Sequence, residues 1–131
     1  MHMITEDEPS YHARALYRRM SARPHRVLYV GLDLALLEYL KERLDECWMV
    51  RAPAACVARP FIEHLNYSLL VFDEVLMDGT ARELERFTRE LENRRWTPVI
   101  IFKKSDEFES LARNISNRLG RMNRARQLTS R

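Results

Sequence analysis

Residues 68–84 read SLLVFDEVLMDGTAREL and combine an apolar run, an acidic turn and the start of a periodic segment. The run Leu69–Phe72 ends at Asp73, and the periodic segment begins just after Asp78-Gly79. This order is typical of a strand, a loop and a helix. In an open parallel sheet, ligands bind outside the carboxyl ends of the strands. The stretch therefore predicts an α/β fold with Asp73 in a candidate site.

Three more apolar runs predict strands of the same sheet, at residues 26–30, 48–51 and 98–102. A helical pattern follows each strand, at residues 33–44, 54–65, 80–91 and 106–119 in chain order. Pro60 lies inside the second of these patterns and is expected to break or kink it. Strands that alternate with helices are connected by right-handed crossovers. The chain is therefore expected to form a parallel sheet.

Three residues or pairs predict where helices begin and end. Asp33 stands at the N-cap position of the first pattern. Thr80 and Glu83 have the spacing of a capping box, in which each side chain bonds to the other residue's backbone N–H. Gly120 follows the last apolar stripe and predicts the end of the last helix.

The chain has 131 residues, which suits a single domain, and its net charge is only +3. The charge is uneven: five arginines and no acid lie between Pro9 and Leu32, and six arginines and no acid follow Ser110. We therefore divide the chain into an N-terminal extension (1–25) with a basic amphipathic helix from Ser10, a domain (26–120) and a basic tail (121–131).

Several classes of protein are excluded by what the sequence lacks. Cys47 and Cys56 have no metal-type spacing, and no apolar run reaches the roughly 18 residues that span a bilayer. The acidic N-terminus has no apolar core of a secretory signal, so we expect a cytoplasmic protein with no membrane partner. There is no Gly-rich phosphate loop and no Ser/His/Asp set, so we do not expect an enzyme.

Two segments, 70–81 and 98–102, resemble the third strand with its loop and the fourth strand of the receiver domain of bacterial two-component response regulators. The resemblance covers residues 26–120 and implies a flavodoxin-like fold with strand order 2-1-3-4-5. It also implies that Asp73 is the phosphoacceptor, that Mg²⁺ is the cofactor and that a histidine kinase is a partner. A carboxylate can attack a phosphoryl group only when the combined negative charge is neutralised, which is the role of the metal.

The resemblance breaks at the metal-binding acids. Gly31 and Leu32 stand where the family has its acidic pair, and Asp33 is one position further on. Asp33 and Asp73 are the candidate Mg²⁺ ligands, but helix capping also explains Asp33. Because each lost carboxylate weakens a magnesium site, Mg²⁺ binding is possible and doubtful at once.

It breaks again after the fourth strand. Lys103 occupies the position of the family's switch Thr or Ser, and we expect it to pair with Asp73. Only 29 residues follow Phe102, fewer than the roughly 35–40 that a full path through the fifth strand and helix needs. The prediction is thus a four-stranded sheet in order 2-1-3-4 without the fifth strand. Its exposed fourth-strand edge would be covered by the N-terminal helix, a second copy of the chain or a partner.

Three functions remain open from the sequence. The first is an atypical receiver-like signalling domain that works by protein–protein contact with a kinase or a downstream regulator, with impaired or absent phosphorylation and with dimerisation through the strand-four edge. The second is a working phosphorelay receiver that is phosphorylated at Asp73. The third is nucleic-acid binding through the Arg-rich termini, although the sequence offers no reading helix and little aromatic interleaving with the tail.

Overall fold

The computed structural model describes residues 25–129, with side chains through residue 125. The predicted N-terminal helix therefore lies outside the described residues. The elements are β1 (His25–Val30), α2 (Leu34–Arg43), β2 (Cys47–Ala52), α3 (Ala55–His64), β3 (Leu69–Asp73), β4 (Val75–Leu76), β5 (Gly79–Thr80), α4 (Ala81–Glu90), the short 3₁₀ helix η1 (Glu92–Arg94), β6 (Val99–Phe102) and α5 (Phe108–Thr129).

The main sheet has four parallel strands in the order β2-β1-β3-β6. Its register aligns Leu28 with Val50 on one side and with Leu70 on the other, and Leu70 with Val99. Within residues 25–129 no further strand joins this sheet after β6. The predicted strand order 2-1-3-4 without a fifth strand is therefore confirmed. The strands β4 and β5 form a separate antiparallel hairpin directly after Asp73.

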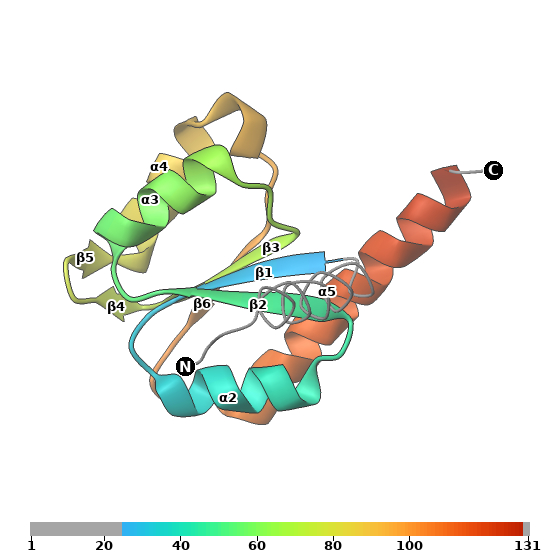
Figure 1. The fold of residues 1–131 in the computed structure, drawn as a ribbon, viewed down its shortest axis with the longest axis horizontal. Coiled ribbons are helices and arrows are strands. Elements are labelled where there is room, and N and C mark those ends of the chain that lie inside the picture. The colour runs from blue at the N-terminus through green and yellow to red at the C-terminus, as the bar shows by residue number, and fades with distance from the viewer. Residues whose placement is uncertain (1–24, 130–131) are drawn as a thin grey trace, which may run out of the picture.

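The sheet separates two apolar cores, because alternate residues of a strand face opposite sides. Val27 and Tyr29 pack with the buried residues of α2 and α5. Leu28 and Val30 pack with those of α3 and α4. Figure 1 shows this arrangement, with α3 and α4 on one side of the sheet and α2 and α5 on the other.

The two helix starts that were predicted from capping residues, at Asp33 and at Thr80, are confirmed. The Asp33 carboxylate accepts a hydrogen bond from the Leu36 N–H at 3.0 Å and caps α2. Thr80 and Glu83 form the complete capping box of α4.

Helix α3 has a cap that the sequence did not indicate. Ala54 stands at its N-cap position, and its methyl group cannot accept a hydrogen bond. Instead, the two oxygens of the Asp78 carboxylate accept hydrogen bonds from the Ala55 and Cys56 N–H groups, each at 2.8 Å. Asp78 comes from the β4–β5 hairpin, so this hairpin is joined to the start of α3. Pro60 lies inside α3 without ending it.

Helix α5 runs through Gly120, so the predicted helix end at this glycine was wrong. Packing on both sides of the glycine explains the continuation. Leu119 is fully buried, Met122 contacts the same core, and the Asn123 side chain bonds to the buried His25 ring at 2.7 Å. These contacts outweigh the roughly 1 kcal/mol cost of a glycine within a helix. Helix α5 continues across the predicted boundary at residue 120, and β1 begins at His25, one residue before the predicted start of the domain. The division into 1–25, 26–120 and 121–131 itself stays a prediction.

After β6 the chain crosses to the α2 side of the sheet. There Tyr39 and Arg43 of α2 bond to the Glu109 carboxylate, and the Ser116 hydroxyl donates to Glu46 at 3.1 Å. Among residues 25–129, each helix is either too short or too polar to traverse a lipid bilayer.

The Asp78 cap yields a stability prediction. We expect Asp78→Ala to lower the Tm at neutral pH by roughly 3–8 °C, the size typical of a lost helix cap in a small domain.

The two N–H bonds lower the pKa of Asp78, so the cap stabilises the fold above the carboxyl's ordinary pKa and is lost as the pH falls through the lowered value. The gap between variant and wild type should therefore close in acid. Glu42→Gln, an exposed acid elsewhere, is the control in the same thermal melts. Equal Tm values for Asp78→Ala and wild type at neutral pH would contradict the cap.

Candidate functional site

The candidate site lies at the carboxyl ends of β1, β3 and β6. Asp73 is the last residue of β3 and aligns with Phe102, the last residue of β6. The neighbouring strand β1 ends at Val30 and continues into the loop that leads to α2. This is the edge at which parallel sheets bind their ligands. The structure thus places Asp73 where the sequence predicted it.

The partner of Asp73 is a buried tyrosine from the neighbouring strand. The Tyr29 hydroxyl lies 2.9 Å from both oxygens of the Asp73 carboxylate, so its single O–H donates a hydrogen bond shared between them. The same hydroxyl accepts a hydrogen bond from the Asp33 N–H at 3.1 Å. Tyr29 is fully buried. Its phenol therefore connects the aspartate, β1 and the start of α2 in one chain of hydrogen bonds.

Burial dominates the electrostatics of this pair. It raises the pKa of Asp73, and the nearby Asp33 adds to the rise, while the bonds from Tyr29 and from the Leu32 N–H oppose it. Burial also raises the pKa of the Tyr29 hydroxyl, which keeps it protonated as a donor. The environment of Asp73 thus favours the neutral carboxyl more than water does.

Gly31 is required because the space beside it is occupied. A Cβ at this position would lie 2.1 Å from the Asp73 Oδ2 and 2.5 Å from the Tyr29 hydroxyl oxygen. Such approaches are far inside van der Waals contact, and both neighbours are held by hydrogen bonds. The position where the resemblance expects the first metal-binding acid therefore has no room for a side chain while Asp73 and Tyr29 keep these places.

The donors around Asp73 fit Mg²⁺ poorly. Asp33 lines the same cleft of about 220 Å³ as Asp73, but its Oδ1 caps α2. Both oxygens of Asp73 already accept from Tyr29. Within the described part of the chain, no group of three or more acids, histidines or cysteines could hold a metal ion. Mg²⁺ needs near-octahedral oxygen ligation, and three of the four carboxylate oxygens of the two predicted ligands already accept hydrogen bonds.

Lys103 and Lys104, the two lysines that follow β6, line two different pockets. Lys104 lines the Asp73 cleft, together with Glu74 and Phe102. Lys103 lines a second groove, beside Ile101. Among residues 25–125, no ion pair joins Asp73 to either lysine. The expected pair of Lys103 with Asp73 is absent, and Tyr29 takes its place.

Three residues of this region are not predicted as site residues from the sequence: Tyr29, Lys104 and Asp78. One signal for Tyr29 was present. A tyrosine in a buried run whose other members are aliphatic, as in residues 27–30, must bring its hydroxyl to a polar partner, and here it lies one residue before the strand end. Asp78 had no comparable signal, because its partners lie 22 and 23 residues away in the sequence.

Comparisons with known proteins find matches to the structure of this chain but none to its sequence. No protein-family model matches this sequence, and no curated protein matches it significantly. Solved structures do match. The receiver domain of a signal transduction histidine kinase from Syntrophus aciditrophicus has a TM-score of 0.63 at 17% identity, over 73% of this chain and 90% of that one.

Two further structures show the same likeness. A CheY-like response regulator receiver domain from Methanospirillum hungatei has a TM-score of 0.60 at 21% identity, over 77% of this chain and 98% of that one. The receiver domain of a sensor histidine kinase from Pseudomonas aeruginosa, which has a magnesium ion coordinated in its active-site cleft, has a TM-score of 0.62 at 15% identity, over 73% and 98%. The chain therefore has the flavodoxin-like fold of response-regulator receiver domains.

Proposed function

We propose that the chain is a signalling module of the receiver fold that works by binding protein partners and in which phosphorylation of Asp73 is impaired. The observation that supports this best is the Tyr29–Asp73 pair packed against Gly31. In a working phosphoacceptor the carboxylate must be exposed to the phosphoryl group and share a metal with neighbouring acids. Here a buried phenol bonds to both carboxylate oxygens, although Asp73 also lines the cleft, and the two groups fill the space beside Gly31, where a metal-binding acid would have to stand.

The partners proposed are a histidine kinase or a downstream regulator, and the compartment is the cytoplasm. Solved structures of this fold come from response regulators and from histidine kinases, which are signalling proteins. We assign no enzymatic activity to the chain, because the site offers no activated nucleophile other than Asp73. Mg²⁺ binding at Asp33 and Asp73 is proposed to be weak or absent.

Acetyl phosphate tests the proposal directly. We expect no phosphoryl adduct on the intact protein after incubation with acetyl phosphate and Mg²⁺, as measured by mass spectrometry at neutral pH. Asp73→Asn is the matched control, and Tyr29→Phe is a second variant that removes only the hydroxyl. An adduct on the wild type that is lost in Asp73→Asn would establish the alternative function, a working receiver phosphorylated at Asp73.

The raised pKa of Asp73 predicts how stability depends on pH. The folded state holds this proton more tightly than the unfolded state, so stability falls as the pH rises from the ordinary carboxyl value, about 4, through the raised one. Asp73→Asn removes this dependence. We expect the variant to be more stable than wild type in neutral urea melts, and the difference to shrink as the pH falls. A variant that is less stable at neutral pH would show that the Tyr29 bond, not burial, dominates.

Nucleic-acid binding is the second alternative, and one observation favours it. Helix α5 carries exposed arginines at 121 and 124, with no acid after residue 109. We nevertheless expect no shift of random duplex DNA at low salt. A salt-dependent shift that Arg121→Gln/Arg124→Gln reduces would support this alternative. The substitutions are preferable to a truncation, because Met122 and Asn123 pack against the domain.

A further inference from the structure

Strand β6 forms an open edge of the sheet within the described residues. It pairs with β3 on one side, and no strand of residues 25–129 lies on its other side. The chain that follows crosses to the α2 side as α5, so it leaves this edge uncovered (Figure 1). Soluble proteins normally block such edges, because exposed N–H and C=O groups pair with other strands.

The hydrogen bonds to β3 determine which groups of β6 face outward. The Leu70 N–H donates to the Pro98 carbonyl at 3.0 Å, and the Glu74 N–H donates to the Phe102 carbonyl at 2.9 Å. In a parallel ladder, successive residues face opposite neighbours. Residues 97, 99, 101 and 103 therefore turn their backbone groups toward the open side.

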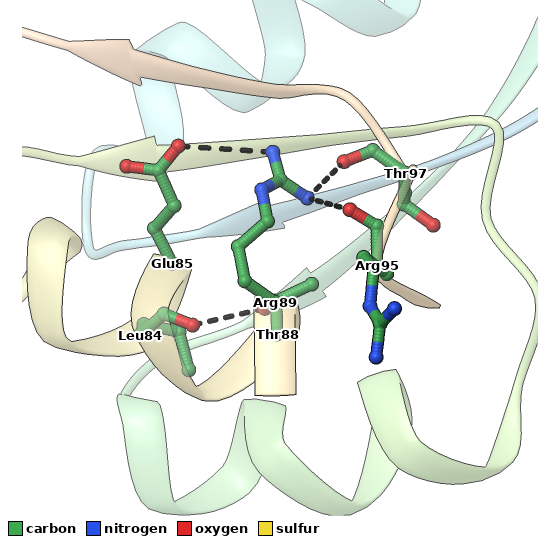
Figure 2. Close-up of polar contacts among 6 residues, drawn as sticks. All are labelled: Leu84, Glu85, Thr88, Arg89, Arg95 and Thr97. Atoms are coloured by element: carbon green, nitrogen blue, oxygen red, sulfur yellow. Dashed lines mark hydrogen bonds and ion pairs between the residues drawn. The ribbon is translucent and has the colours of Figure 1, made fainter. Parts of the chain in front are cut away.

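The chain itself closes both ends of this edge. At the start, the Arg89 guanidinium donates to the carbonyls of Thr97 at 2.6 Å and Arg95 at 3.1 Å, and Glu85 lies 3.7 Å from the same guanidinium (Figure 2). At the other end, the Asp106 carboxylate accepts from the Lys103 N–H at 2.9 Å, and the Asp106 N–H donates to the Lys103 carbonyl at 2.9 Å.

Two residues remain open between these caps. The N–H and C=O groups of Val99 and Ile101 have no hydrogen-bond partner among residues 25–129. Both side chains are only partly buried. The open part of the edge is thus a short window, and the backbone groups of Thr97 and Lys103 on either side of it already have hydrogen-bond partners. Such an edge has room for one short strand.

A groove adjoins this window on the side of α4. It measures about 340 Å³ and has an apolar part, two cations and one acid; its lining is Val75, Ala81 and Ile101, the hydroxyl residue Thr80, the cations Arg82 and Lys103, and Glu74. Two cations against one acid give this lining a net positive charge. Val75 is 76% exposed, which is unusual for a valine. The Asp106 carboxylate is already bonded to the Lys103 backbone. The groove therefore favours an apolar side chain next to a carboxylate.

We propose that the window Val99–Ile101 and its groove bind an extended, acidic segment of a partner protein as the fifth strand of the sheet. The backbone of that segment would pair with the four open groups, and its side chains would enter the groove. This inference rests on the proposed function as a protein-binding module and names the surface and the kind of partner.

A second copy of the chain fits this edge less well. Antiparallel pairing about Ile100 would satisfy the four open groups of each copy. However, it would also place Arg89 of one copy against Lys103 of the other. Glu85 already pairs with Arg89, and the Asp106 carboxylate already bonds to the Lys103 backbone. Like charges that face each other across a strand pair oppose association.

A fluorescent peptide tests the proposal on the full chain. The probe is a short blocked peptide with a valine- and threonine-rich centre and glutamates at both ends, measured by fluorescence anisotropy. We expect it to bind at least about tenfold more tightly than the same peptide with lysines in place of the glutamates. Methylation of alternate backbone nitrogens of the probe should abolish binding, because it removes the pairing donors.

Variants locate the binding on the chain. Ile101→Pro removes one outward N–H without touching the ladder to β3, and should weaken binding by about tenfold with the Tm little changed. Lys103→Glu should reverse the charge preference, whereas Arg113→Glu, on α5, should leave it intact. If Ile101→Pro itself unfolds, the Lys103→Glu and Arg113→Glu comparison decides.

Two results would overturn the inference: no binding of the acidic probe in low salt, or a wild-type dimer in sedimentation velocity that Ile101→Pro dissociates. Both are independent of the acetyl phosphate experiment, which reads Asp73 alone. A failure at the edge and a failure of the proposed function are therefore distinguishable.

Discussion

The hydrogen bond from the Tyr29 hydroxyl to the Asp73 carboxylate fixes the carboxyl edge of this sheet. It joins the two central strands at the point where both end, and through the Asp33 N–H it also joins the start of α2. A hydrogen bond to a charged group contributes about 1.5–3 kcal/mol, and loss of the phenol would leave the half-buried carboxylate without its side-chain donor.

The same bond constrains the residues around it. Because the phenol and the carboxylate fill the space above Gly31, a side chain at that position would displace one of them. A tyrosine at residue 29 and a glycine at residue 31 therefore depend on each other. A phosphoacceptor site needs the opposite arrangement, with acids at the strand end and an accessible carboxylate. The geometry of the site and the residues around it both support the proposal that phosphorylation of Asp73 is impaired.

The path of α5 is the second constraint. By crossing to the α2 side, the helix completes one apolar core with Leu111, Ile115 and Leu119, and no strand of residues 25–129 lies on the outer side of β6. Within the part of the chain that the structure describes, the caps supplied by Arg89 and Asp106 limit the unpaired backbone of this edge to two residues. A sheet with a longer open edge would pair with many strands, whereas this one presents a restricted surface.

The sequence by itself determined the elements whose signals are local. The apolar runs predicted the four parallel strands and their order through the resemblance, and Asp33 and the Thr80–Glu83 box predicted helix starts, because each cap lies within one turn of the N–H it binds. Tertiary structure decided the rest. The Tyr29–Asp73 bond joins residues 44 positions apart, and the Asp78 cap spans 22 and 23. Gly120 stays helical because Leu119 is buried and His25 holds Asn123. The physical reason is that a cap or an apolar stripe is encoded within a few residues, whereas the partner of a buried polar group is chosen by whichever side chains the folded sheet brings together.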